Sequence, residues 1–218
     1  MIIVFSGTDG AGKSTQIERL VGCYSKQRRN SCYLWARGGY TPGFSLIKRL
    51  LRLLAGNKLP TAGVSNNREV MLKKGSVARL WLRLAILDLI LFYGLYARFL
   101  HYRGKVVICD RYIEDTYLDF TRNFGNDFQP QGLLWRALVL LAPRPSKAFL
   151  LTVPVDVSLY RSTLKHEPFP DTPETLEWRL QQYMDEAIFP SSQFYKIDCQ
   201  NSVNDIQQEI QKQLVKGI

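Results

Sequence analysis

Eight residues near the start of the chain constrain it more than any other segment. They spell GTDGAGKS at positions 7–14 and match the pattern GxxxxGK[S/T] at every fixed position. The apolar run Ile2–Ser6 before them indicates a strand, and the residues after them follow a helical pattern. Glycines let the backbone curl so that its N–H groups point at phosphate oxygens, and the positive end of the next helix attracts the same anion. The segment therefore predicts a phosphate-binding loop, rather than a glycine turn that merely joins two elements.

The positions in this loop have separate expected roles. Lys13 would reach the β- and γ-phosphates of a nucleoside triphosphate, and the Ser14 hydroxyl would bind magnesium. We therefore predict ATP and Mg²⁺ as cofactors and Lys13 as a catalytic residue. The residues predicted to bind the cofactor in this segment are Gly7, Asp9, Gly10, Ala11, Gly12, Lys13, Ser14 and Thr15.

A second segment supports the first. Val106–Asp110 is an apolar run that ends in a carboxylate, an arrangement that holds magnesium or its water opposite a phosphate-binding loop. An aspartate at the end of a strand also serves commonly as a helix cap. Together with the loop, the pattern favours Asp110 as a metal ligand beside Ser14.

Short β-branched runs alternate with longer helical patterns along the chain. This rhythm predicts an α/β protein with three layers, in which helices flank a parallel five-stranded sheet. A chain of 218 residues suffices for one good core, so we expect a single domain over 1–218. The predicted strands are Ile2–Ser6, Ser31–Ala36, Lys105–Cys109, Lys147–Thr152 and Phe194–Ile197. The predicted helices are Lys13–Gln27, Phe44–Ala55, Val77–Tyr102, Leu133–Ala142, Val155–Leu164, Pro173–Ala187 and Val203–Val215.

The net charge of +10 favours an anionic partner, which charge alone does not identify. A nucleic-acid-binding module would need aromatic residues clustered between basic ones, whereas most aromatics here have the spacing of helix cores. We therefore expect no nucleic acid partner. The apolar stretch Leu84–Ala97 carries Asp88 and falls short of a membrane-spanning length, so it predicts a buried core helix and no membrane span.

Cysteine usage and the first residues point to the cytoplasm. The four cysteines are scattered, with no CxxC pair, and suit small apolar positions in a reducing compartment. The first ten residues have neither the basic front nor the cleavage region of a signal peptide.

Two motifs together resemble the thymidylate kinase family of P-loop nucleoside monophosphate kinases. The family typically has a GxDGxGKSTQ loop and a later DRY or DRH tripeptide; this chain has TDGAGKSTQ at 8–16 and Asp110-Arg111-Tyr112. Weaker similarities extend over most of the chain: Arg37-Gly38-Gly39 is similar to the family's REPGG loop, 153–156 with Arg161 to the entry into its lid, and 195–198 to its C-terminal part.

The resemblance implies the three-layer P-loop kinase fold and an enzyme, a kinase that transfers the γ-phosphoryl group of ATP to a nucleoside monophosphate such as dTMP or a related acceptor. It implies that Arg37 and Arg111 grip the acceptor phosphate, with Arg111 also near the transferred group and therefore catalytic. Asp9 would accept a hydrogen bond from the acceptor's sugar hydroxyl, or would alternatively cap the loop. The substrate-binding set is thus Asp9, Arg37, Arg111, Tyr112 and Asp115.

The resemblance also implies a lid over about 162–172. Family members without an arginine in the phosphate loop place basic residues in the lid, and this loop has Gly10 and Ala11 at that point. Lys165 is then the catalytic lid cation, or else an ordinary exposed lysine, and His166 is a bystander because an ionised phosphate acceptor needs no general base. Arg161 at the lid's root would stack on adenine and so bind the cofactor.

The chain departs from the family where the family contacts thymine. Leu89, Asp115 and Phe120 stand at positions where family members carry an arginine, a serine and a glutamine. A site that loses such hydrogen-bonding groups should discriminate less. We therefore expect dTMP to be a poor substrate, and the acceptor to be another monophosphate or the hydroxyl of a nucleoside or sugar, with Glu114 and Asp115 accepting hydroxyl protons.

An alternative function stays open, and the oligomeric state is a further expectation. A P-loop ATPase or a degenerate nucleotide-binding protein without a small-molecule acceptor would also need the loop. The resemblance and the dense apolar residues of the Leu80–Leu100 helix predict a homodimer.

Overall fold

The computed structural model describes residues 1–36, 41, 75–164 and 171–215. The predicted helix Phe44–Ala55, the predicted site residues Arg37 and Lys165, and His166 lie outside these ranges. The chain forms two compact units, the first made of Met1–Trp35, Leu100–Asp115 and Arg144–Ile218, and the second of Ala36–Phe99 and Thr116–Pro143. The single domain predicted from the sequence stays a prediction.

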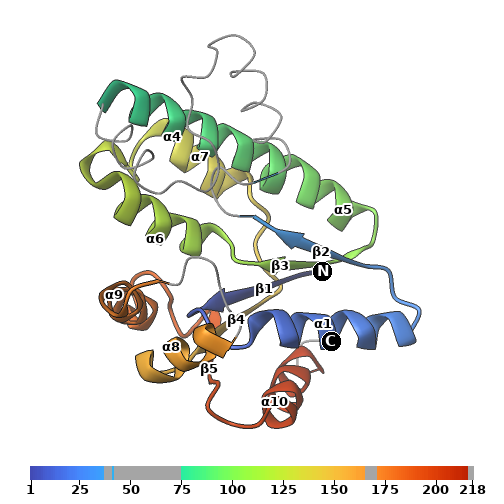
Figure 1. Cartoon of the computed structure of the whole chain (residues 1–218). Helices are drawn as coiled ribbons and strands as arrows, with labels where there is room; N and C mark the ends of the chain where they lie inside the picture. Colours follow the sequence, from blue (N-terminus) through green and yellow to red (C-terminus); the bar gives the residue numbers. More distant parts are fainter. Residues whose placement is uncertain (37–40, 42–74, 165–170, 216–218) are drawn as a thin grey trace. The chain divides into compact units, whose positions relative to one another are not determined.

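The first unit contains a five-stranded parallel sheet (Figure 1). Its order is β2-β3-β1-β4-β5, so that β1 lies at the centre. The strands are β1 (Ile2–Gly7), β2 (Ser31–Trp35), β3 (Val106–Asp110), β4 (Lys147–Thr152) and β5 (Phe194–Asp198). The predicted α/β fold with a parallel five-stranded sheet flanked by helices is confirmed, and each predicted strand end lies within a residue of the observed one.

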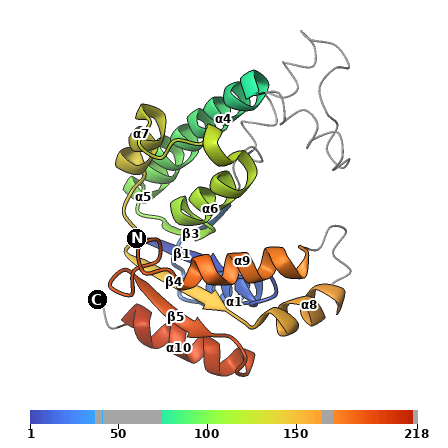
Figure 2. The same ribbon diagram turned by 90° about the vertical axis from the view of Figure 1, so that its left-hand side faces the viewer.

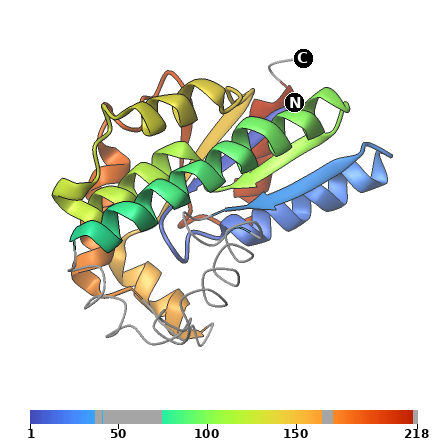
Figure 3. The same ribbon diagram turned by 90° about the horizontal axis from the view of Figure 1, so that it is seen from above.

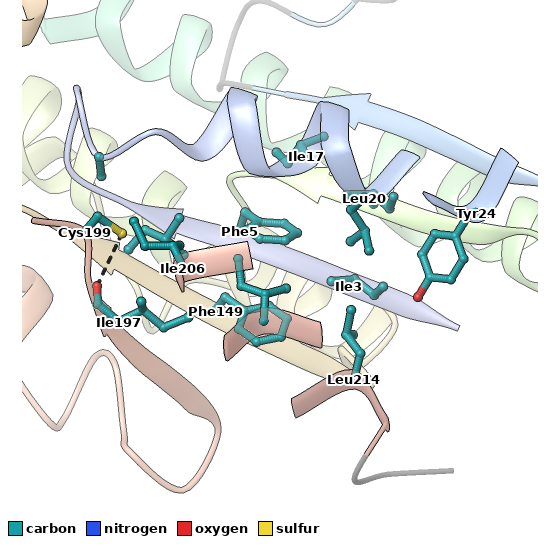
Figure 4. Close-up of a cluster of buried hydrophobic side chains, with 14 of the residues drawn as sticks. Ile3, Phe5, Ile17, Leu20, Tyr24, Phe149, Ile197, Cys199, Ile206 and Leu214 are labelled. Atoms are coloured by element: carbon teal, nitrogen blue, oxygen red, sulfur yellow. Dashed lines mark hydrogen bonds between the residues drawn. The ribbon is translucent and has the colours of Figure 1, made fainter. Parts of the chain in front are cut away.

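One face of this sheet is covered by α1 (Lys13–Lys26) and α10 (Val203–Val215), which lie side by side (Figure 1). Apolar residues recur at helical spacing on the inner face of each helix, so burial of one stripe drives both onto the sheet. Phe5 of β1 and Phe149 of β4 stack at 5.3 Å between their ring centroids beneath them. Figure 4 shows this cluster, whose helix residues include Ile17, Leu20, Tyr24, Ile206, Ile210 and Leu214.

Two more helices of the first unit, α8 (Val155–Leu164) and α9 (Pro173–Met184), lie against each other (Figure 2). Thr172 caps α9, because its hydroxyl oxygen accepts from the backbone N–H of Thr175 at 3.3 Å, and proline fills the first helical position. Tyr183 near the end of α9 is fully buried against Phe189, with ring centroids 5.0 Å apart. The helix ends three residues earlier than the sequence predicts.

Helices dominate the described part of the second unit. A long helix is composed of α4 (Gly75–Leu89), the π-helical segment η2 (Ile90–Ala97) and α5 (Arg98–Tyr102), whose last residues belong to the first unit. Figure 3 shows α7 (Leu133–Leu141) running beside it. Between them in the sequence come α6 (Ile113–Phe124) and the 3₁₀ turn η3 (Gly125–Asp127). Aromatic rings join α6, α7 and the turn: Tyr117, Phe120, Phe124, Phe128 and Trp135.

The long helix matches the predicted helix Val77–Tyr102, but its apolar part is longer than the stretch Leu84–Ala97 that the sequence analysis considers. Among the described residues, Ala78–Tyr102 is a helix of 25 residues that could cross a membrane by length and composition alone. The expectation that this stretch falls short of a spanning length is therefore wrong. One such helix is weak evidence for a membrane span, because core helices of soluble proteins pass the same test, and 44% of its most apolar window is buried.

Candidate nucleotide-binding and phosphotransfer site

The loop after β1 depends on glycine for its shape. Gly7, Gly10 and Gly12 all have positive φ, at 136°, 76° and 84°, in the region that side chains rarely adopt. A Cβ on Gly7 would lie 1.8 Å from the carbonyl oxygen of Leu151 in β4. Only glycine therefore fits where the loop leaves the sheet.

Several hydrogen bonds hold this loop against its neighbours. The backbone N–H of Thr8 donates to the Leu151 carbonyl at 3.1 Å, and the Thr8 hydroxyl accepts from the N–H of Val153 at 3.1 Å. The Ser158 hydroxyl in α8 donates to the carbonyl of Asp9 at 2.6 Å. Such a fixed loop is preorganised to receive an anion without first paying the entropy of ordering.

Arg161 of α8 also anchors the loop. One guanidinium nitrogen donates to the carbonyl of Gly10 at 2.9 Å, and the other donates to the carbonyl of Cys199, just after β5, at 3.1 Å. The adenine-stacking role of Arg161 stays a prediction. The structure adds a positioning role, which the sequence does not indicate because the two carbonyls are distant in the chain.

Lys13 lies folded over the loop that it follows. Its ammonium group donates to the carbonyls of Gly7 at 3.0 Å and Thr8 at 2.8 Å, and lies 3.9 Å from the Asp9 carboxylate. Burial lowers the pKa of Lys13, and the nearby guanidinium of Arg111 lowers it further. A bound polyphosphate would be a stronger partner than neutral carbonyls, so the ammonium is placed to transfer its hydrogen bonds to it.

Asp110 ends β3 next to the central strand, in register with Phe5. Asp110 is 6% exposed; its Oδ2 accepts from the Tyr33 hydroxyl at 3.1 Å, and its Oδ1 is buried with no hydrogen-bond partner among the residues that the structure describes. Ser14 lies exposed in the first turn of α1, directly after the loop. An unsatisfied carboxylate oxygen and a hydroxyl are the hard oxygen donors that Mg²⁺ prefers, so these two residues fit the predicted ion. Among the described residues, no cluster of three or more His, Cys, Asp or Glu offers a metal site of its own.

Arg111 follows Asp110 in a left-handed backbone conformation, with φ of 73°. Its backbone N–H donates to the carbonyl of Phe5 at 2.8 Å, which ties this turn to the central strand. Its buried guanidinium donates to the Asp9 carboxylate at 2.6 Å. A non-glycine residue at positive φ is strained, and such strain clusters at functional sites.

Asp115, in the first turn of α6, is 1% exposed and holds this region together. Its Oδ2 accepts from the Ser6 hydroxyl at 2.6 Å and from the backbone N–H of Tyr112 at 3.0 Å, which caps the helix. Its Oδ1 accepts from the Tyr183 hydroxyl at 2.8 Å and lies 3.7 Å from Arg111. These contacts give Asp115 a positioning role, and its predicted substrate-binding role stays a prediction.

The other two departures from the thymine-contacting residues fill the core of the second unit. Leu89 is fully buried in the long helix, and Phe120 is buried in the aromatic cluster of α6 and α7. Beside Leu89, the buried Asp88 carboxylate accepts a hydrogen bond from the hydroxyl of Thr41. Apolar packing explains why these positions carry no hydrogen-bonding groups.

The structure thus brings most of the predicted site residues together at the carboxyl edge of the sheet. Lys13 and Arg111 both contact the Asp9 carboxylate, and the charge of Asp110 partly offsets the lowering of the Lys13 pKa. Ala11 and Tyr112 are buried, whereas Thr15 is exposed on α1. The sequence analysis misses Tyr33, Ser158 and Tyr183, because a lone tyrosine or serine in a helix or strand carries no pattern that distinguishes it.

Comparison with known proteins identifies the relatives of this chain. No family model matches it. It is 24% identical over 213 residues to a thymidylate kinase of Bifidobacterium longum subsp. infantis, covering 94% of this chain and 82% of the relative. It is 24% identical over 211 residues to a thymidylate kinase of Bifidobacterium longum, covering 94% and 93%. With a probable thymidylate kinase of Thermococcus kodakarensis it shares 32% identity over 164 residues, which cover 74% of this chain and 70% of the relative. At that identity and coverage, with the glycine loop and the Asp110-Arg111-Tyr112 turn in place, the chain belongs to the thymidylate kinase family.

Proposed function

We propose that this protein is an ATP-dependent nucleoside monophosphate kinase that transfers the γ-phosphoryl group to dTMP or a related monophosphate. Family membership supports this reaction class. The observation that carries the proposal is the contact of Lys13 and Arg111 with the same carboxylate, Asp9, in the loop. Two fixed cations beside a phosphate-binding loop match what phosphoryl transfer requires.

The residues of this chain would act mainly through charge. The transition state spreads negative charge over the oxygens of the transferred group, so preorganised cations stabilise it more than the ground state. Lys13 would hold the β- and γ-phosphates, and Arg111 would exchange Asp9 for the acceptor phosphate. Asp110 and Ser14 would hold Mg²⁺, which would neutralise phosphate charge.

One assay tests this proposal: ADP release by the purified protein with Mg²⁺ and ATP against a panel of nucleoside monophosphates, nucleosides and sugars. A monophosphate-dependent rate well above the rate without acceptor is the expected result. ADP release that no acceptor stimulates would instead identify an ATPase, and no release would indicate a nucleotide-binding protein.

A second candidate function, a kinase for a hydroxyl of a nucleoside or sugar, is favoured by Glu114. This residue follows Arg111 by three positions, and its Oε2 is buried with no hydrogen-bond partner in the described part of the chain. Burial raises the pKa of Glu114 to about 7, with a smaller contribution from the neighbouring charge of Asp115. A carboxylate with a pKa near 7 suits a general base, which a hydroxyl acceptor needs and an ionised phosphate does not. The nucleosides and sugars of the same panel distinguish this function.

We also propose that the protein is a homodimer. The long helix presents a stripe of exposed apolar residues at helical spacing, and burying such a stripe between two copies would be favourable. The stripe consists of Leu80, Leu87, Leu91, Leu95 and Phe99.

Sedimentation at micromolar concentration should give twice the monomer mass of 25.1 kDa. Leu91→Lys should produce monomers, whereas Tyr160→Lys, at an exposed position of α8, should not. A wild-type protein that sediments only as monomer rejects the dimer.

The location is proposed to be cytoplasmic, with no membrane span and no nucleic acid partner. The four free thiols support a reducing compartment. Fractionation of cells that express the tagged full-length protein would test this, since recovery in the membrane fraction after salt washing contradicts it.

A further inference from the structure

Among the described residues, Tyr33 donates a side-chain hydrogen bond to Asp110, the predicted metal-binding carboxylate. It lies in β2 opposite Ile108 of β3, two residues before Asp110, and the strand register puts its side chain on the same face of the sheet as that carboxylate. Its hydroxyl donates to Oδ2 of Asp110 at 3.1 Å. The Tyr33 ring itself is 47% exposed on an edge strand, so packing alone does not account for its position.

The hydrogen bond makes the two oxygens of Asp110 inequivalent. Oδ2 is occupied by the tyrosine hydroxyl, while the buried Oδ1 has no partner within the described part of the chain. A carboxylate held at one oxygen cannot rotate freely, which fixes the direction of the other. The tyrosine hydroxyl is the donor of this bond, because an ionised carboxylate only accepts.

We propose that Tyr33 is a positioning residue that orients Asp110 so that Oδ1 faces the magnesium ion or its water. The inference rests on the proposed function, which requires the magnesium ion. It adds to that function the residue that holds the metal ligand Asp110 in place. Removing a residue that hydrogen-bonds to a metal ligand typically weakens metal affinity by about tenfold or more.

Metal binding without turnover provides the main test. The full-length protein is saturated with a non-hydrolysable ATP analogue, and Mn²⁺ is titrated by calorimetry and by electron paramagnetic resonance. Tyr33→Phe should weaken Mn²⁺ binding about tenfold and leave metal-free analogue binding unchanged, because the loop is untouched. The matched control is Tyr195→Phe, a partly exposed tyrosine on the opposite edge strand β5.

Kinetics give a second readout. Tyr33→Phe should raise the Mg²⁺ concentration for half-maximal rate, while kcat at saturating Mg²⁺ returns close to that of the wild type. Tyr33→Met, which also lacks the hydroxyl, should behave alike, so that a folding defect of one variant does not decide the result.

Mn²⁺ binding within twofold of wild type in both variants overturns the inference. The inference also fails if the wild-type protein binds the ATP analogue with the same affinity with and without the metal. The proposed function can fail separately: a wild type that binds metal and nucleotide but phosphorylates no acceptor would leave the role of Tyr33 intact.

Discussion

Replacing Asp115 by serine tests whether this carboxylate holds the site together or contacts the acceptor. Serine is the residue that family members carry there. In the structure the carboxylate accepts three hydrogen bonds, from Ser6, Tyr112 and Tyr183, at 2.6 to 3.0 Å. A serine hydroxyl is shorter and would keep at most one of them.

The expected cost follows from those contacts. Hydrogen bonds to a charged group each contribute about 1.5–3 kcal/mol, and losing two of them leaves the fully buried hydroxyl of Tyr183 without an acceptor. Arg111 loses a carboxylate at 3.7 Å but keeps Asp9 at 2.6 Å. We expect Asp115→Ser to lower the free energy of unfolding by about 3–5 kcal/mol, the usual cost of removing one partner from a buried charged pair.

Urea unfolding with an unchanged m-value measures this cost, and dTMP turnover is measured on the same samples. Asp156→Ser on the exposed face of α8 is the control and should cost less than about 1 kcal/mol. The positioning role is refuted if Asp115→Ser stays within about 1 kcal/mol of wild type and improves dTMP turnover. That outcome would confirm the substrate-binding role that the sequence analysis assigns to Asp115.

Three other substitutions have defined outcomes. Lys13→Ala should abolish phosphoryl transfer because the β- and γ-phosphates lose their closest cation, and near-normal turnover would show that this loop is not the active site. Gly7→Ala should destabilise the protein by at least about 1–3 kcal/mol in urea, because its φ of 136° and the Leu151 carbonyl exclude a side chain, whereas Gly22→Ala in open space on α1 should be neutral or stabilising. For Glu114, whose folded pKa of about 7 exceeds the ordinary 4.5, the stability contributed by the buried acid is present below pH 4.5 and lost as pH rises through 7. Glu114→Gln should therefore gain up to about 3 kcal/mol relative to wild type between pH 4.5 and pH 8, and parallel stability profiles would contradict this.

The sheet and the loop could be predicted because their signals are local. Each strand is a short β-branched or apolar run with a clear boundary, and GxxxxGK[S/T] places three special backbone conformations at fixed spacing. The carboxyl edge of a parallel sheet is also where such loops gather, so Asp110 could be assigned to the same site.

Helix α6 is missing from the sequence analysis, although its apolar residues recur at helical spacing. Its inner face also buries Asp115, Thr116 and Asp119, polar residues that in a sequence alone indicate an exposed segment. Those polar groups are accommodated by long-range hydrogen bonds such as that from Ser6, 109 positions away. A contact of that range leaves no trace in a single sequence. The π-helical segment Ile90–Ala97 is missed for a related reason, since its composition is that of any apolar helix.

In the proposed function, capture of phosphate and recognition of the base depend on different residues, and the two sets compare differently with the family. Lys13, Asp110 and Arg111 keep the family residues, and Lys13 and Arg111 both contact the Asp9 carboxylate. At the thymine-contacting positions, by contrast, the replacements are satisfied by the protein: Leu89 and Phe120 by apolar packing and Asp115 by hydrogen bonds. A buried group that is already satisfied gains little from a substrate base, so the discrimination that unsatisfied groups provide is absent at these positions. Efficient phosphorylation of dTMP, at kcat/KM of about 10⁵ M⁻¹s⁻¹ or above, would mean that other residues recognise the base. A broad or altered acceptor range is the outcome that these three replacements favour.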